Sequence, residues 1–475
     1  MVKSSYDAAF SHPGGFHVND QSLTQCLLFP DLFDKPVVAR FDQVHSSSDG
    51  GAILLKAADR RLGLLARLAG CLRDDRQPGK VDHELAELLT QRIYAIACGY
   101  EDANDAARLG DDPVHKMLVG RDPITGNGLA SQPTLSRFEN GVGPRDLYRM
   151  AETLRDVVIE RHCRRLHGKA RRIKIDFDPT DDPTHGQQQL SFFNGHYDSW
   201  CYLPLMGFIS FDKEPEQYLV ASVLRPGNVH GTAGFFGVLR RLVERLMEAF
   251  PRADILVRLD ADYATPEVLE FLDDAGLHYV VAMAKNSVLT RHAESLMKKA
   301  RRLSGASGRT ERVYGECRYA ARKWNRKRRV IIKAEVTRLE GREPKDNPRF
   351  VVTNLTTDPR RVYEKVYCER GDIENRIKEL HHGMQIDRTS CSRFLANQFR
   401  VLMTAAAYIL MQELRLRLAR TSCARAQVST LRERLIKLGV HVVVSVRRIV
   451  LHLPASFPFL DIWNHAALSM GARAG

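Results

Sequence analysis

The sequence predicts a mixed α/β fold, because two kinds of apolar periodicity alternate along its 475 residues. Every second residue is apolar from Ile173 to Phe177, as in a strand with one buried face. Apolar residues recur at helical spacing from Leu85 to Ile96. With 44% hydrophobic and 27% charged residues, the composition is that of a folded protein of roughly two to four domains.

The N-terminal third of the chain is predicted to consist of an irregular segment followed by a helical region. Residues 1–80 mix short apolar runs with Gly, Ser and Asp, so we expect an irregular lead-in that packs on something larger. Residues 80–168 are predicted to be helical, with one helix ending at Gly99, short helices after two Asp-Pro pairs, and a longer helix opened by Pro144.

One run in this region, SQPTLSRFENG at 131–141, resembles the recognition helix of helix-turn-helix repressors. In that interpretation the region binds DNA and Arg137 faces base edges. The alternative is an ordinary capped helix whose Leu135 and Phe138 face the bundle, because so short a match has a high false-positive rate.

The period changes from helical to alternating at Arg171, where a new domain is predicted. The expected order is strand 173–177, strand 201–211, strand 217–224, helix 232–250, strand 255–259, helix 265–276 and strand 278–284. Short turns between the first three strands indicate an antiparallel meander, and the β-α-β end indicates parallel pairing. This order is that of the ribonuclease-H-like fold, so residues 169–300 are expected to form the first part of such a core.

The remaining chain is predicted to complete this core around an insertion. Residues 301–360 are basic and strand-rich and look inserted. A helix resumes within 361–390, from Val362 to His382, and would complete the core. Residues 391–475 are expected to form a C-terminal helical region, with an apolar helix from Phe394 and a hairpin or edge strand within 436–453.

The charge balance points to a polyanionic partner. The chain has 71 Lys and Arg against 57 Asp and Glu, a formal net charge of +14, with basic clusters at Arg161–Lys174 and Arg322–Arg329. Double-stranded DNA fits clustered charge better than a small acid does, although such runs are often only solvated surface.

Other features of the composition favour a cytoplasmic protein. The longest apolar run, Val401 to Met411, is shorter than the roughly 20 residues of a membrane span, so no membrane is expected. The N-terminus lacks the apolar stretch of a secretory signal. Nine cysteines without a C-x-x-C pair indicate reduced thiols. We therefore expect a cytoplasmic protein.

Three acidic residues fall where the predicted core would use them. Asp178 ends the first strand, Asp260 directly follows the fourth, and Glu374 lies in the late helix. Such carboxylates can converge on two Mg²⁺ ions, with Mn²⁺ able to substitute, that clamp the attacking and leaving oxygens of a phosphoryl transfer. Asp176 is the alternative first ligand, because it shares a strand face with Asp178. Most single acidic residues are merely solvated or cap helices, so the argument rests on the combination.

The late helix carries further candidate residues at spacings of three, four and four: Tyr367, Arg370, Glu374 and Lys378. Arg370 and Lys378, on either side of a metal-binding Glu374, could hold DNA phosphates. The alternative is a set of salt bridges on an exposed helix.

The pattern Y-x-x-R-x-x-x-E-N-x-I-K-E at 367–379 resembles the signature of bacterial DDE transposases whose insertion domain precedes the Glu. Four further blocks are similar to the insertion sequence 1380 group of the insertion sequence 4-like superfamily: GYEDANDAARLGDDP at 99–113, LASQPTLSRFEN at 129–140, DFDPTDDPTHGQQ at 176–188 and DRTSCSRFLANQFR at 387–400. The resemblance covers roughly residues 35–455.

This resemblance implies a transposase with a catalytic and metal-binding triad of Asp178, Asp260 and Glu374. Such an enzyme cleaves transposon ends and joins the 3′-hydroxyl to target DNA. Pairing two inverted repeats requires at least a homodimer in the DNA complex. One departure stands out, since the superfamily's Lys seven residues after the Glu is His381 here. The alternatives are an inactive, domesticated DNA-binding protein and a ribonuclease-H-like nuclease.

Trp324 is a further candidate DNA contact, because Arg322, Lys323 and four more cations of the run 322–329 flank it. An indole among cations can stack an unpaired base, and related transposases are thought to use an aromatic residue in this way. The alternative is a Trp packed against its own hairpin.

Two weaker candidates lie near the predicted site. His185 and Gln187 could reach phosphates or order a loop. A zinc site at His381-His382 with Cys368 or Cys391 is rejected, because the spacing fits no standard site.

Overall fold

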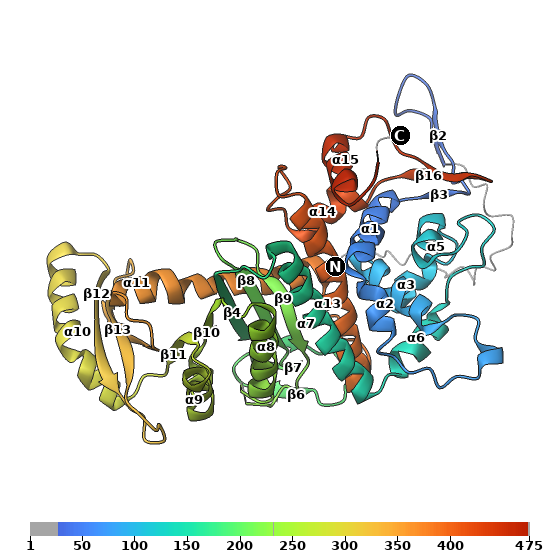
Figure 1. Ribbon diagram of the computed structural model, residues 1–475. Helices are drawn as coiled ribbons and strands as arrows, with labels where there is room; N and C mark the ends of the chain where they lie inside the picture. The colour runs from blue at the N-terminus through green and yellow to red at the C-terminus, as the bar shows by residue number, and fades with distance from the viewer. Residues whose placement is uncertain (1–26, 231, 474–475) are drawn as a thin grey trace, which may run out of the picture.

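The computed structural model describes residues 27–230 and 232–473. It confirms a mixed α/β architecture built on a nine-stranded sheet, in the order β12-β13-β15-β11-β10-β4-β8-β9 with β14 paired to β13. This sheet spans the left and central parts of Figure 1, and helices make up most of the right part. Its strands are β4 (Arg172–Pro179), β8 (Leu205–Phe211), β9 (Tyr218–Val223), β10 (Asp254–Leu259), β11 (His278–Met283), β12 (Glu311–Tyr319), β13 (Arg328–Thr337), β14 (Lys345–Asp346) and β15 (Arg349–Thr353).

The predicted meander and β-α-β end are both present in the central five strands. Strand β8 is antiparallel to β4 and β9, whereas β10 is parallel to β4 and β11 is parallel to β10. Helix α8 (Phe235–Ala249) joins β9 to β10, and α9 (Pro266–Asp274) joins β10 to β11. Thr265 caps α9 by accepting a hydrogen bond from the Val268 amide, as Thr-Pro at a helix start predicts. In this arrangement the carboxyl ends of β4 and β10 meet at one edge.

The single strand predicted over 201–211 is wrong, because it is two strands in different sheets. Strand β7 (Ser199–Tyr202) pairs with β5 (Asp182–Pro183) and β6 (Phe192–Asn194) in a small sheet, and β8 begins only at Leu205. The break falls at Pro204, which has no N–H to continue a ladder and whose carbonyl accepts from the Thr180 amide. No residue pattern predicts β5 or β6, because they contain only two and three residues.

The inserted strands extend the central sheet. Strand β15 is antiparallel to both β11 and β13, and β13 is antiparallel to β12, so the strand-rich character predicted for residues 301–360 is confirmed. Helix α10 (Ser287–Ser307) covers β12 and β13 and was not predicted. Its buried stripe includes small residues such as Ala293, Ala300 and Ser304, which weaken the apolar period.

The predicted helices of the N-terminal region are present: α3 (Leu85–Cys98), α4 (Ala103–Arg108), α5 (Pro113–Val119), α6 (Gln132–Asn140) and α7 (Pro144–Leu166). Gly99 ends α3 with a φ of 93°, a left-handed conformation that favours glycine. The expectation of an irregular lead-in fails over 53–69, where α1 (Ile53–Leu62) and α2 (Leu64–Ala69) form. Gly63, with a φ of 65°, divides this apolar stretch into two short helices, which obscured its period.

Helix α13 (Phe394–Arg417) runs through the helical half and contacts α1, α3, α7 and β9. By length and hydropathy it could cross a membrane, which the shorter apolar run at 401–411 did not suggest, but 83% of its most apolar stretch is buried within the protein. That environment is typical of a central core helix. The C-terminal part also contains α14 (Val428–Leu431), α15 (Leu460–Ser469) and the predicted hairpin, β16 (Val440–Ser445) with β17 (Arg448–His452).

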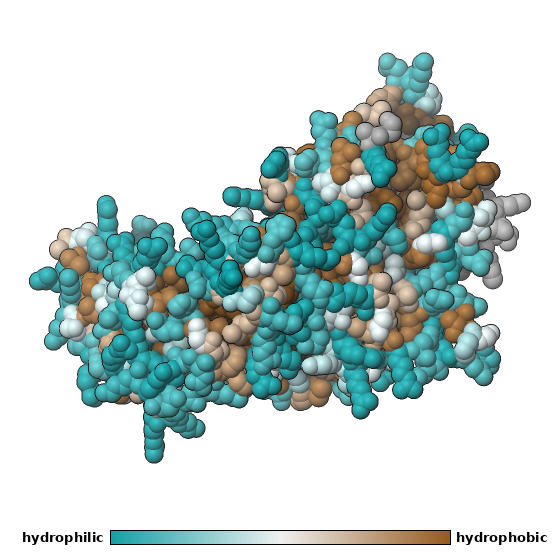
Figure 2. Space-filling view, in the orientation of Figure 1, coloured by the Kyte–Doolittle hydropathy of each residue, from teal (hydrophilic) through white to brown (hydrophobic). Residues whose placement is uncertain are grey.

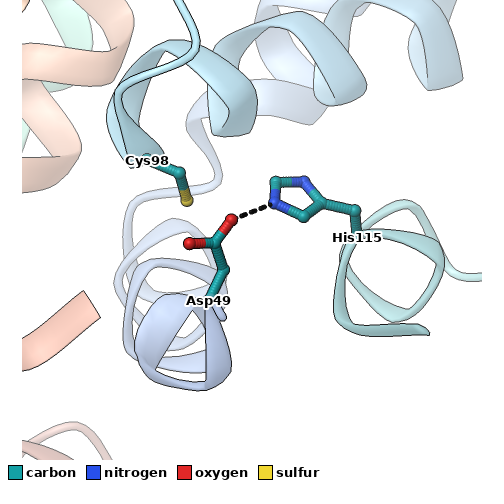
Figure 3. Close-up of side chains that lie close together, drawn as sticks. All are labelled: Asp49, Cys98 and His115. Atoms are coloured by element: carbon teal, nitrogen blue, oxygen red, sulfur yellow. Dashed lines mark hydrogen bonds and ion pairs between the residues drawn. The ribbon is translucent and has the colours of Figure 1, made fainter. Parts of the chain in front are cut away.

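A buried polar cluster joins the N-terminal and C-terminal segments to the helices between them. Figure 3 shows Asp49, which is fully buried, hydrogen-bonded to His115 at 2.8 Å. The other Asp49 oxygen accepts from Lys437 Nζ at 2.7 Å, and this ammonium lies 3.9 Å from the Tyr100 ring centroid. Burial raises the pKa of Asp49, but hydrogen bonds from His115 and Lys437 outweigh that effect and lower it overall. The cluster thus holds an ionised carboxylate in the core.

We predict that Asp49→Ala lowers the free energy of unfolding by about 2–4 kcal/mol, because it leaves Lys437 and His115 without their partner. Denaturant unfolding at pH 7 measures the loss, with exposed Asp274→Ala as the control. A loss no larger than the control's would show that the cluster contributes little.

Candidate active site

The structure places the three predicted carboxylates around one edge of the sheet. Asp178 lies near the end of β4, and Asp260 directly follows the neighbouring parallel strand β10. Asp260 accepts a hydrogen bond from the Ala261 amide at 2.7 Å, which holds it at the start of a short 3-10 helix. Glu374 is exposed in the first turn of α12 (Asp372–Met384).

Asp178 lies within electrostatic range of Asp260 and Glu374, although the ligand oxygens of the three do not all lie within 4.8 Å of one another. Burial raises the pKa of Asp178 to about 6, the charge of Arg370 opposes this, and the nearby charges of Asp260 and Glu374 raise it further. The Arg370 guanidinium lies 2.6 Å from Asp178. Among the described residues, Arg370 is the one cation in a salt bridge with any of these three carboxylates, so negative charge is in excess here, and oxygen ligands of this kind suit Mg²⁺ or Mn²⁺.

Asp176 has a different environment, although it lies on the same strand face. It is 1% exposed and faces Arg258 in register on β10. Arg258 donates to both carboxylate oxygens, at 2.7 and 2.6 Å, and Gln217 donates to one of them at 3.0 Å. Because both oxygens are already engaged, the geometry favours Asp178 over Asp176 as a metal ligand.

Arg258 is a positioning residue that the sequence argument missed. It is 1% exposed, and its remaining terminal nitrogen donates to the Val366 carbonyl at 3.1 Å. The available signal was an arginine inside the otherwise apolar strand ILVRL, since a buried charge requires a partner.

The segment that leads to Glu374 is helical but irregular. The short helix α11 (Pro359–Arg361) is followed by a π-helix, Val362–Tyr367, then by a 3-10 helix, Cys368–Gly371, and then by α12. Regular helical spacing therefore does not describe how Tyr367, Arg370 and Glu374 are arranged. The three are nevertheless brought to the site by this segment.

The proposed DNA contacts on this segment differ in exposure. Tyr367 is half-buried, and burial followed by the charge of Asp260 raises its pKa, so it lies beside that carboxylate. Arg370 is 8% exposed and bound to Asp178, which suits a positioning residue better than a free phosphate ligand. Lys378 is exposed on α12, as a phosphate contact requires.

His381, at the position of the superfamily's Lys, links α12 to the end of β4. Its Nδ1 lies 3.0 Å from an Asp387 oxygen, and its Nε2 lies 3.1 Å from Thr180 Oγ1. His185 and Gln187 line a cleft of about 730 Å³ together with His381. These candidates therefore share one polar cleft that begins beside the site.

Another buried carboxylate near this cleft was not singled out from the sequence. Asp182 is fully buried, and burial raises its pKa to about 8. Thr389 donates to both of its oxygens at 3.0 Å, which ties β5 to the loop after α12.

A second group of metal-ligand residues lies away from this site. Within residues 27–230 and 232–473, the one cluster with ligand atoms inside 4.8 Å is Asp49, Cys98 and His115, so no cluster supports zinc at His381-His382. Lys437 already places an ammonium on Asp49, and burial raises the pKa of the Cys98 thiol well above its usual range. A cation would meet a like charge and a protonated thiol there, so a structural role explains this cluster better.

Trp324 is packed rather than presented to solvent. It is 9% exposed, lies edge-on to Tyr319 at 5.6 Å and lies 5.2 Å from the Arg328 guanidinium. Asp273 pairs with Arg328 and also with Arg326, so these cations of the basic run are neutralised. This arrangement favours the packed alternative.

The two remaining predicted DNA contacts of the insertion, Arg322 and Lys323, are exposed. They are therefore available to a nucleic-acid backbone, whereas Trp324 beside them is not.

The predicted recognition helix forms as α6, with Arg137 on its exposed side. Leu135 and Phe138 are buried, and Phe138 packs against Phe399 at 5.1 Å between ring centroids. The buried face therefore matches the ordinary-helix alternative. The exposed face leaves Arg137 beside a cavity of about 480 Å³.

A sheet edge with two aspartates and a facing helix with a glutamate define a class of metal-dependent phosphoryl-transfer sites. The chain matches the family described as "Transposase DDE domain group 1" over residues 29–472, and it belongs to that family. No curated protein matches the chain significantly.

We predict that Asp176→Ala destabilises the fold by about 3–5 kcal/mol, because it leaves the buried Arg258 unpaired. Asp178→Ala should cost less, since Asp260 and Glu374 repel the carboxylate that it removes. Denaturant unfolding of both variants makes the comparison. Equal losses would contradict the distinction between a structural and a functional aspartate.

Proposed function

We propose that the protein is a DNA transposase that cleaves transposon ends and joins the freed 3′-hydroxyl to target DNA. The observation that carries this proposal is the placement of Asp178 and Asp260 at the ends of neighbouring parallel strands, with Glu374 in electrostatic range of Asp178, in a member of a DDE transposase family. The central strand order β9-β8-β4-β10-β11, with its meander and two parallel crossovers, supports a ribonuclease-H-like core around them.

The carboxylates fit a pair of divalent cations, because Arg370 is the one cation that forms a salt bridge with any of them among the described residues. Asp178, Asp260 and Glu374 would hold the ions, which supply charge neutralisation at the attacking and leaving oxygens. Arg370 orients Asp178, and Arg258 holds Asp176 and the helical segment in place. Tyr367 stands beside Asp260, and the exposed Lys378 is placed to bind a flanking phosphate.

The DNA partner is supported by the family and by the net charge of +14. We infer that α6 contributes to recognition of the inverted repeats through Arg137, and that Arg322 and Lys323 contact the backbone. Two ends require two active sites, so the DNA complex would be a homodimer. The sequence blocks further support membership of the insertion sequence 1380 group and action in the bacterial nucleoid.

We predict that Asp260→Ala and Glu374→Ala each abolish strand cleavage in Mg²⁺ while DNA-end binding changes less than about threefold, because the basic surface is retained. Cleavage of a labelled end and filter binding test both effects. Asp372→Ala, on another face of α12, is the matched control.

Retained cleavage in either variant would contradict the assignment of Asp178, Asp260 and Glu374 as the catalytic residues. Cleavage of random duplexes as efficient as that of the ends would favour a plain nuclease instead.

Arg137→Ala should reduce discrimination between the terminal repeat and random DNA by about 1–3 kcal/mol if Arg137 reads a guanine. Competition binding at fixed salt measures this, with the exposed Arg420→Ala as the control for a general loss of charge. An unchanged preference would limit α6 to a structural role.

A further inference from the structure

Two hairpins at one end of the molecule expose an unusual amount of apolar surface. They are β1 (Leu27–Phe29) with β2 (Val37–Ala39), and β16 with β17. Figure 1 draws β2 and β16 at the same end, and Figure 2 shows brown surface there. Eight apolar residues within 27–44 and four within 443–449 are each at least 37% exposed. We call these two segments together the hairpin face.

The hairpin face has the size of a protein interface. Scaling full residue areas of roughly 150–200 Å² by the exposed fractions gives roughly 1,200 Å² of apolar surface. The largest apolar patch of a typical monomer is about 300–600 Å². One partner in a standard interface buries about 800 Å². The exposed apolar area of the hairpin face is therefore larger than the apolar patch of a typical monomer and is sufficient for a stable protein contact.

Charge divides this face into two complementary halves. The segment 27–44 carries exposed Asp31, Asp34 and Asp42 against two cations, a balance of 2 − 3 = −1. The hairpin 440–452 carries exposed Arg447 and Arg448 and no acidic residue, a balance of +2. Among the described residues, these five charged groups make no ion pair.

We propose that the hairpin face joins two copies of this chain. In a two-fold dimer, the acidic segment of each copy meets the basic hairpin of the other, so one self-complementary contact occurs twice. The apolar side chains, among them Phe33, Phe41 and Val446, are buried between the copies. The inference rests on the proposed function in one respect: a transposase that acts on two DNA ends needs two active sites. DNA is the less suitable occupant, because the face is apolar and half of it is acidic.

The test uses two charge-reversed full-length chains. One carries Asp31→Arg, Asp34→Arg and Asp42→Arg, and the other carries Arg447→Glu and Arg448→Glu. Light scattering without DNA should give twice 53.8 kDa for the unchanged protein and at least tenfold weaker self-association for each variant alone. An equimolar mixture should recover the dimer, because both contacts between unlike variants again pair opposite charges.

Apolar variants provide the second arm. Phe41→Asp with Val446→Asp should weaken association at least tenfold, whereas Leu339→Asp, also exposed but in the insertion, should not. Circular dichroism confirms that each variant is folded.

A monomeric unchanged protein at tens of micromolar overturns the proposal. So does a mixture that stays monomeric, since packing of the two hairpins within one chain cannot be rescued by mixing. Asp260→Ala should dimerise normally, so loss of the triad assignment would leave this inference standing.

Discussion

The ion pair between Asp176 and Arg258 is the interaction on which the site depends. It lies between adjacent parallel strands, both side chains are 1% exposed, and two short hydrogen bonds join them. A buried pair of this kind offsets its desolvation only with near-ideal geometry, which fixes β4 against β10. Arg258 also binds the Val366 carbonyl, and so the same guanidinium anchors the helical segment that carries Arg370 and Glu374. This one buried contact therefore joins the strands that lead to Asp178 and Asp260 and the segment that leads to Glu374.

The central strands and the position of Asp178 and Asp260 at strand ends could be predicted because both rest on local patterns. Alternation marks the strands, and an acidic residue at a strand end is visible in the sequence itself. The strand end at Pro179 favours Asp178 over Asp176, but residues two apart share a face, so the sequence does not show how deeply each side chain is buried. The two residues differ in burial and in hydrogen-bond partners. Asp176 is buried and binds Gln217 and Arg258, which are distant in sequence.

The same limit explains the treatment of Trp324. The sequence shows a tryptophan among free cations, but Asp273, about fifty residues earlier, neutralises Arg326 and Arg328 and so closes the site around the indole. A run of charged residues in the sequence shows which side chains need an ion-pair partner, but it does not show which of them the fold provides with one. Helix α10 and the helices at 53–69 were missed for a related reason. Small residues in α10 and a glycine between α1 and α2 weaken the apolar periodicity, so the buried faces are evident only from the elements that pack against them.

The insertion and the active site are coupled through the backbone. Because β15 pairs with both β11 and β13, the inserted strands are a continuation of the central sheet, and the chain returns from them to the site along one helical path, as the α11 ribbon in Figure 1 shows. On this path the π-helix at Val362–Tyr367 replaces regular α-helical turns, and one additional residue in a turn rotates everything after it by about 100°. A regular helix from Pro359 onward would present a different face of α12 to Asp178 and Asp260. The orientation of Glu374 is thus set jointly by where the insertion ends and by the irregular turn that Arg258 anchors, which explains how a helix that follows the inserted residues 301–360 can still complete the site.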